Sequence, residues 1–219
     1  VSKVWNRLEQ IAKRGYTIVI YGTANHEETR STFSRAKKHG SAIIVENIND
    51  AQLLCNFIKG EVNKEEIQKH FYLKYCNNFN ISQDLKKLGV VNQTTMLASD
   101  TQEIINLFTN TFQTIHKTND TSQYVANTRD TLCYATHENQ ESTLNLLKHN
   151  TDLAIVVGGY NSSNTTHLVE LSSQTTKTYF INSSDKIKLN NSICHFDIKT
   201  KKEITTYDFM PDSKCKIIL

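Results

Sequence analysis

Short runs of β-branched residues alternate with longer helical segments along most of this chain, and this rhythm limits the folds that it can adopt. Thr17–Tyr21 is typical of a buried parallel strand, and Ala42–Val45 and Leu153–Val157 continue the series. Strands that alternate with helices in this way pair in parallel through right-handed crossovers. The sequence therefore predicts an α/β protein built on parallel sheets.

The same rhythm occurs twice along the chain. A chain of 219 residues is too long for one average domain and suits two compact ones. The stretch 116–130 is polar and poor in large aliphatic residues, so we interpret it as a linker. We therefore expect two similar parallel-sheet αβ domains, one over 1–128 and one over 129–219, with the last strand of the second cut short at Leu219.

The regular alternation lapses between residues 60 and 84. This segment is rich in Lys, Asn and aromatic residues, and it predicts a surface insertion with a helix over Lys64–Tyr75. The other expected elements are helices over 27–39, 138–149 and 165–173, strands at 89–92, 132–134 and 178–181, and two helices capped by Asn49 or Asp50 and by Ser99 or Asp100.

Composition and charge exclude several classes of protein. The net charge of +3 is too small to imply nucleic-acid binding, and no apolar stretch approaches the ~18 to 20 residues needed to cross a bilayer. We therefore expect neither a nucleic-acid partner nor a membrane. The five cysteines include no C-x-x-C pair, which argues against a zinc ribbon, and their odd number argues for a reducing compartment.

Unusual polar groups follow the predicted strands. In parallel sheets, ligands gather beyond the carboxyl ends of the strands. Polar turns occupy such positions at 23–28, 93–95, 133–136 and 158–164. We therefore expect a functional site beyond these strand ends.

The turn at 158–164 reads Gly-Gly-Tyr-Asn-Ser-Ser-Asn. Two glycines allow a sharp backbone turn, and small hydroxyl and amide side chains then lie at a helix N-terminus, where free N–H groups and the helix dipole favour an anion. The alternative is an ordinary capped turn between a strand and a helix.

His26, Glu27 and Glu28 occupy a similar position after the first strand. A histidine can donate to a phosphate and a neighbouring carboxylate can move protons. The alternative is an acidic pair that only complements the helix dipole. Thr94 follows another strand, where a threonine can also be nothing more than a β-former.

Cys133 ends a predicted strand at the presumed ligand face. It is either a metal ligand or a small buried hydrophobic residue, and the second is the usual role of a lone cysteine in apolar surroundings.

Six motifs occur together in the order found in a known family. They are V-S-K-V at 1–4, N-H-E-E-T at 25–29, V-E-N-I-N-D-A at 45–51, N-Q-T-T at 92–95, C-Y-A-T at 133–136 and V-V-G-G-Y-N-S-S-N at 156–164. On these motifs the chain resembles the 4-hydroxy-3-methylbut-2-enyl diphosphate reductase family (IspH, also called LytB), which catalyses the last step of the non-mevalonate isoprenoid pathway.

The resemblance implies three similar αβ domains around a central iron–sulfur cluster, with one cysteine ligand from each domain. Cys133 would be one of these metal ligands to a 4Fe–4S cluster, which can also be observed as a 3Fe–4S cluster. His26, Ser162, Ser163 and Asn164 would bind the diphosphate of the substrate.

The resemblance also implies a reaction. Glu28 matches the proton-delivering acid of the family, and Thr94 matches the hydroxyl that holds the substrate alcohol and relays the proton. Two electrons and protons would expel the hydroxyl as water and yield isopentenyl and dimethylallyl diphosphate. The N-H-E-E-T form is similar to plastid and cyanobacterial members, which implies ferredoxin as electron donor and the stroma of a plastid or apicoplast as location.

The chain matches only part of the family pattern. The first domain has no counterpart, the C-P-x-V motif is entered at Val1, and the Gly/Ser loop that follows the last strand lies beyond Leu219. We therefore expect a longer protein to carry the reductase activity and this fragment alone to be inactive. The alternative is a redox-inactive diphosphate-binding α/β module whose cysteines are structural.

Overall fold

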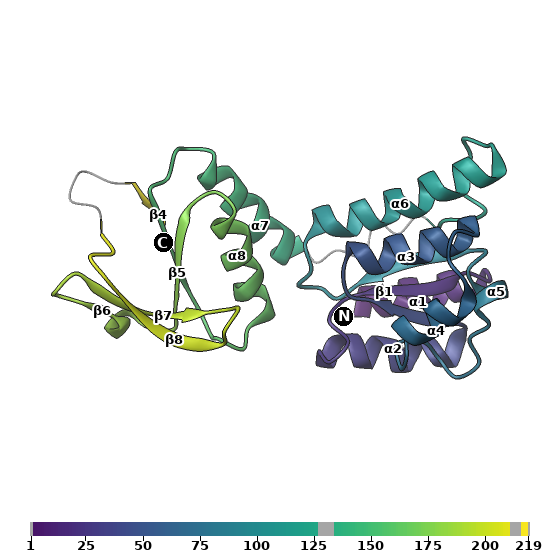
Figure 1. Cartoon of the computed structure of the whole chain (residues 1–219), viewed down its shortest axis with the longest axis horizontal. Coiled ribbons are helices and arrows are strands. Elements are labelled where there is room, and N and C mark those ends of the chain that lie inside the picture. The colour runs from purple at the N-terminus through teal and green to yellow at the C-terminus, as the bar shows by residue number, and fades with distance from the viewer. Residues whose placement is uncertain (1, 127–133, 211–215, 219) are drawn as a thin grey trace. The chain divides into compact units, whose positions relative to one another are not determined.

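The computed structural model describes residues 2–126, 134–210 and 216–218. The chain forms two compact units, Val1–Cys133 and Tyr134–Leu219 (Figure 1). Among the described residues, none of the helices combines the length and the apolar character that a bilayer crossing requires.

The first unit is built on a three-stranded parallel sheet with the order β2-β1-β3. Its elements are α1 (Ser2–Lys13), β1 (Thr17–Tyr21), α2 (Glu27–His39), β2 (Ala42–Val45), α3 (Ile48–Lys59), α4 (Lys64–His70), α5 (Ile81–Asp84), β3 (Leu88–Asn92) and α6 (Ala98–His116). In the register of the sheet, Tyr21 lies opposite both Val45 and Asn92. The three strands therefore end at the same level, and the turns that follow them start side by side.

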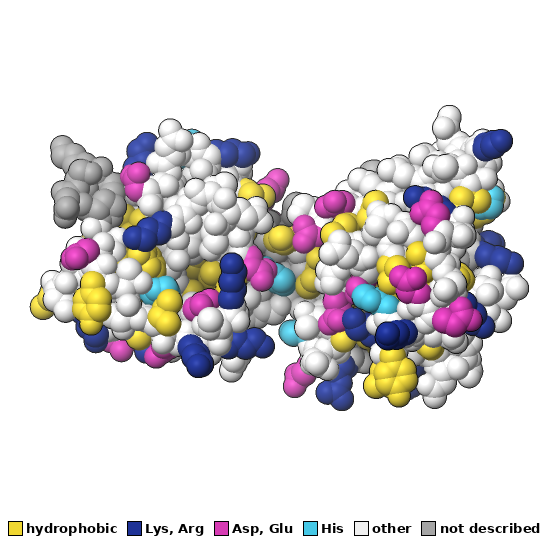
Figure 2. Space-filling view, viewed as in Figure 1, with side chains coloured by type: hydrophobic (Ala, Val, Ile, Leu, Met, Phe, Trp, Pro, Cys, Tyr) yellow, Lys and Arg dark blue, Asp and Glu magenta, His cyan; other side chains and the backbone are white. Residues whose placement is uncertain are grey.

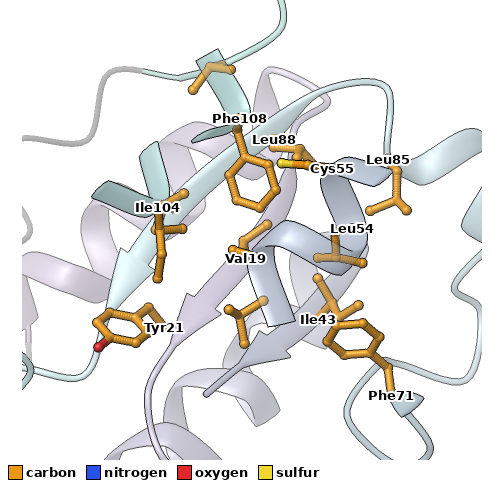
Figure 3. Packing of buried hydrophobic residues seen from close by; sticks show 14 of the residues in the cluster. Val19, Tyr21, Ile43, Leu54, Cys55, Phe71, Leu85, Leu88, Ile104 and Phe108 are labelled. Atoms are coloured by element: carbon orange, nitrogen blue, oxygen red, sulfur yellow. The ribbon is translucent and has the colours of Figure 1, made fainter. Parts of the chain in front are cut away.

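Helices cover both faces of this sheet, which explains why its strands are apolar throughout. Val19 of β1 packs against α3 and α6, and Figure 3 shows it with Leu54 and Phe108 around it. Ile18 and Ile20 point to the opposite face, toward α1 and α2. The predicted bounds of β1, β2 and α2 are confirmed, as is the α/β class.

Two helix caps differ from the sequence prediction. Helix α3 is capped by Asn47, whose Oδ1 accepts the Asp50 amide at 3.0 Å, and not by Asn49 or Asp50. Helix α6 begins after Leu97 without a side-chain cap, so Ser99 and Asp100 lie inside its first turn. Several polar residues in succession offered alternative caps in the sequence.

The inserted segment covers the free edge of β2. Its helix ends at His70, not at Tyr75 as predicted, and the chain then runs antiparallel to β2, with Tyr75 opposite Ile43. The Ile44 amide donates to the Lys74 carbonyl at 2.7 Å. An unpaired strand edge is a template for aggregation, and this segment removes it.

The predicted linker begins inside the first unit. Val125 lies opposite Leu88 of β3, and the Leu88 amide donates to the Tyr124 carbonyl at 2.7 Å. Val125 and Ala126 are buried. The linker prediction is therefore wrong for these residues, because they extend the first sheet beyond β3.

The second unit repeats the arrangement of the first with a smaller sheet, in the order β5-β4-β9. Its elements are α7 (Tyr134–Leu147), β4 (Leu153–Val157), α8 (Ser163–Ser173), β5 (Lys177–Ile181), the 3₁₀ turn Ser184–Lys186, β6 (Ile187–Lys188), β7 (Ser192–Asp197), β8 (Lys202–Tyr207) and β9 (Ile217–Ile218). The bounds of β4 are as predicted. Tyr134 belongs to a helix and not to the predicted strand 132–134, of which residues 132 and 133 lie outside the described part.

Strands β6, β7 and β8 form a separate antiparallel sheet, and β7 packs beside β5 (Figure 1). No helix or strand was predicted in this region. Polar residues occupy many of its positions, so the alternation that identifies a strand is weak.

Candidate functional site

Glu28 and Thr94 meet beyond the carboxyl ends of β1 and β3. The Thr94 amide donates to Glu28 Oε1 at 3.0 Å, and the Thr94 hydroxyl donates to Glu28 Oε2 at 2.8 Å. Both side chains are half-buried, so each keeps part of its surface exposed to solvent. Glu28 and Thr94 are 66 positions apart in the sequence. Their contact is not explained if Glu28 only complements the helix dipole and Thr94 is only a β-former at a strand end.

His26 is the N-cap of α2 and stands two residues before Glu28. Its Nδ1 accepts the Glu28 amide at 3.2 Å, in the role that Ser, Thr, Asp or Asn usually fill. A neutral imidazole that accepts at Nδ1 carries its proton on Nε2. The free nitrogen of His26 is therefore a donor, which suits an anionic ligand at this helix end.

Gln93 joins the turn after β1 to the turn after β3. It is buried, and its Oε1 accepts the Thr23 amide at 3.1 Å and the Thr29 hydroxyl at 2.9 Å, while its Nε2 donates to Thr95 at 2.7 Å. At Gly22 a Cβ would lie 2.6 Å from Thr29 Oγ1, so only glycine fits there without displacement. Gln93 and Thr29 were not predicted as site residues, although a glutamine directly after an apolar strand was a usable signal.

Ser162, Ser163 and Asn164 begin α8 after β4. Ser162 is the N-cap, and its Oγ accepts the Thr165 amide at 3.3 Å. This much is an ordinary capped turn, although the helix starts at Ser163 and not at Thr165 as predicted. Asn164 adds something else, because its Oδ1 is buried and has no hydrogen-bond partner among the described residues. Such an orphaned polar atom is costly unless a ligand or water satisfies it.

Tyr160 connects this turn to the antiparallel sheet. Its ring stacks on Phe196 of β7 at 4.5 Å between centroids, and its hydroxyl donates to Glu203 of β8 at 2.8 Å. Partial burial, together with that hydrogen bond, raises the pKa of the Tyr160 phenol. The antiparallel sheet β6–β8, which was not predicted, thus supports the predicted turn at 158–164.

The two turns are built alike. Gly22 and Gly158 each end the central strand of a sheet, and the N-cap of the next helix follows four residues later, at His26 and Ser162. In the second unit a Cβ at Gly158 would lie 2.6 Å from Thr165 Oγ1, as a Cβ at Gly22 would from its own threonine. His26, Glu28 and Thr94 come together in the first unit, and the Ser-Ser-Asn turn belongs to the second.

Cysteine ligation is the remaining part of the expected site, and Cys133 lies outside the described residues. Cys55 and Cys76 are buried in the first unit, where burial raises the pKa of the Cys55 thiol and Cys76 Sγ accepts the Ala42 amide. Cys194 lies on β7. Across residues 2–126, 134–210 and 216–218, no group of three or more His, Cys, Asp or Glu side chains is placed to hold a metal ion. The described residues therefore do not form a ligand set for a cluster.

The LytB protein family matches residues 1–206 of the chain. A curated protein of Gloeothece citriformis named 4-hydroxy-3-methylbut-2-enyl diphosphate reductase is 40% identical over 215 residues, which cover 98% of this chain and 52% of that protein. One of the same name from Crocosphaera subtropica is 38% identical over the same shares. The chain thus spans about half the length of these relatives.

A solved structure resembles the described fold. It is that of the E-1-hydroxy-2-methyl-but-2-enyl-4-diphosphate reductase from Plasmodium falciparum, with a TM-score of 0.59 and 27% identity, and the match covers 85% of this chain and 47% of that one. The family match over nearly the whole chain, the relatives and this structure agree: the chain belongs to the LytB protein family.

Proposed function

We propose that this chain supplies most of two domains of a 4-hydroxy-3-methylbut-2-enyl diphosphate reductase that yields isopentenyl and dimethylallyl diphosphate. Its membership of the LytB family and the names of its relatives support this assignment. The chain spans about half of those relatives, so the proposed activity is that of a protein with their full length.

The observation that carries the proposal is the contact between Glu28 and Thr94 beyond the strand ends. Reductive dehydroxylation breaks the C–O bond of the substrate, consumes two electrons and two protons, forms a C–H bond and releases water. The leaving hydroxyl needs a proton, which Glu28 would supply as general acid. Thr94 would orient that carboxyl and hydrogen-bond the substrate alcohol.

Diphosphate binding is assigned to His26, Ser162, Ser163 and Asn164. The His26 Nε2 proton and the backbone amides at the start of α8 are donors of the kind that anions require. Holding the diphosphate would fix the position of the alcohol at the other end of the substrate, which turns proximity into rate.

Electrons would come from an iron–sulfur cluster of the 4Fe–4S or 3Fe–4S type, with Cys133 as one thiolate ligand. When bound, such a cluster supplies single electrons and an open iron for the substrate oxygen. Ferredoxin as donor and a plastid or apicoplast stroma as location complete the proposal, and the likeness to cyanobacterial relatives and to the Plasmodium falciparum structure supports a plastid-type origin.

The test is an assay of the full-length protein, purified and assayed without oxygen. We expect a brown protein that, with a low-potential reductant, converts the allylic alcohol diphosphate into the two products, identified by mass spectrometry. A colourless protein that binds inorganic diphosphate but forms neither product would instead identify a redox-inactive diphosphate-binding module.

A further inference from the structure

Glu46 holds the backbone of the turn that carries His26. It follows β2, as that turn follows β1, and its Oε1 accepts the Ala24 amide at 2.7 Å. Ala24 lies between Gly22, which is confined by its neighbours, and the N-cap His26. The position of this one carboxylate therefore helps to set the position of the His26 ring.

The other oxygen of Glu46 is held by the inserted segment. Lys74 Nζ lies 2.6 Å from Glu46 Oε2, and the two side chains are only 23% and 30% exposed. Asp50 stands beside them: it is buried, accepts the Glu46 amide at 2.9 Å, and pairs with His70 at 2.7 Å. Acidic, basic and histidine side chains accordingly lie close together over α4 in Figure 2.

Lys74 is anchored, unlike the partners in most surface ion pairs. Its carbonyl accepts the Ile44 amide, and its amide donates to the carbonyl of Phe71, a fully buried core residue. The hydrogen-bonded backbone of Lys74 thus fixes the position of its ammonium group beside Glu46. Without the Lys74 ammonium, the repulsion between the Glu46 and Asp50 carboxylates would not be offset. The Glu46 carboxylate would then turn toward water and lose its hydrogen bond with the Ala24 amide.

We propose that Lys74, from the insertion between α3 and β3, is a positioning residue for diphosphate binding, acting through Glu46 and Ala24 on His26. The inference rests on the proposed function of His26 and gives the inserted segment a role in the site. Lys74 touches neither substrate nor reacting atoms.

The test uses the full-length, cluster-containing enzyme and three variants. In Lys74→Met the KM should rise about tenfold while kcat stays within about twofold, because one hydrogen-bonded contact to the diphosphate is misplaced and the chemistry is not. Lys74→Arg should keep the KM near that of the wild type, since it restores the cation. Lys69→Met, an exposed lysine of the same insertion, is the matched control and should change nothing.

A double variant and the melting temperature of each variant separate an effect on positioning from an effect on stability. The Glu46→Gln and Lys74→Met changes should not add in the double variant, because they break one chain of contacts. Lys74→Gln replaces Lys74→Met if the latter does not fold. A lower melting temperature with an unchanged KM, an equal effect of Lys69→Met, or additive effects would each overturn the proposal.

The affinity for inorganic diphosphate, measured by calorimetry, distinguishes this inference from the proposed function. A wild-type protein without reductase activity would refute the function, while a weaker diphosphate affinity in Lys74→Met would still support positioning. An unchanged affinity in an active enzyme would refute the positioning alone.

Discussion

At the scale of single residues, the candidate site is defined by which atoms donate hydrogen bonds and which atoms accept them. Glu28 accepts both donors of Thr94, and His26 accepts the Glu28 amide, so the free His26 nitrogen is a donor. A carboxylate, a hydroxyl and an imidazole therefore lie close to the N-terminus of α2. Each can be altered without disturbing the core, because all three are only half-buried.

Thr94 offers the clearest residue-scale prediction. Thr94→Val keeps the shape of the side chain but removes the hydroxyl that meets Glu28. We expect kcat of the full-length enzyme to fall about 10- to 100-fold, as for the loss of one hydrogen bond to a charged group. Thr94→Ser, which keeps the hydroxyl, should recover most of the rate in a steady-state assay. Equal rates for Val and Ser would show that the hydroxyl has no part in the reaction.

At the scale of elements, each unit places its polar turn by bringing a helix against the end of the central strand. Gly22 and Gly158 make this approach possible, because a Cβ at either position would collide with a threonine of the following helix. The two glycines are therefore needed for the helix to approach the strand end, and their role is structural.

The pair Gly158 and Gly159 tests this directly. A Cβ at Gly158 would lie 2.6 Å from Thr165 Oγ1 and 2.7 Å from its Cγ2, whereas a Cβ at Gly159 would have nothing within 4 Å. We expect Gly158→Ala to lower the free energy of unfolding by about 1 to 3 kcal/mol, and Gly159→Ala to change it by less than about 0.5 kcal/mol. Denaturant titration of both variants measures this, and equal losses would refute the close approach.

His195 makes the antiparallel sheet sensitive to acid. Burial lowers the pKa of its imidazole below the ordinary value of 6.5, although Asp197 partly opposes the shift. The folded sheet therefore favours the neutral ring, and the contribution of His195 to its stability is fully present above pH 6.5 and is lost as the pH falls below that value. Amide hydrogen exchange on β7 and β8 should show protection that declines between pH 7.5 and 5.5.

The matched variants are His195→Gln and the exposed His149→Gln. The first should remove the extra acid sensitivity of the sheet, and the second should keep it. If the protection of wild type and His195→Gln declines in parallel, the buried imidazole is not the cause.

The sequence predicted these elements unevenly, for physical reasons. β1, β2 and β4 were found because a strand buried on both faces must be apolar throughout, which is a local signal. Thr94 and Glu28 were expected together because parallel strands end at one edge. Gln93 and Glu46 were missed because each accepts a backbone amide of a turn that is distant in the sequence, and Gln93 also accepts the Thr29 hydroxyl across 64 residues. The pairing of Val125 with β3 was missed because it depends on a contact across 37 residues of chain.

At the scale of the whole molecule, the proposed reductase site depends on how much of the family pattern the chain covers. It spans about half of its curated relatives, and its described cysteines are committed to packing or lie on β7. Cluster binding is therefore expected to depend on Cys133 together with ligands from the rest of the protein.

Two cysteine variants of the full-length protein test this assignment. Cys133→Ser should abolish the visible absorption of the cluster, because the thiolate ligand is lost. Cys55→Ser should leave it unchanged, since Cys55 is fully buried in the core between the sheet and its helices. Loss of the cluster in Cys55→Ser alone would reverse the two roles.

The central claim is that Glu28 delivers the proton at a site that Thr94 completes. The most direct test is Glu28→Gln in the full-length enzyme, with turnover and the cluster spectrum measured on the same anaerobic sample. We predict an intact spectrum and a turnover at least about 100-fold lower, because an amide of the same shape cannot supply the proton. Turnover close to that of the wild type would contradict the account.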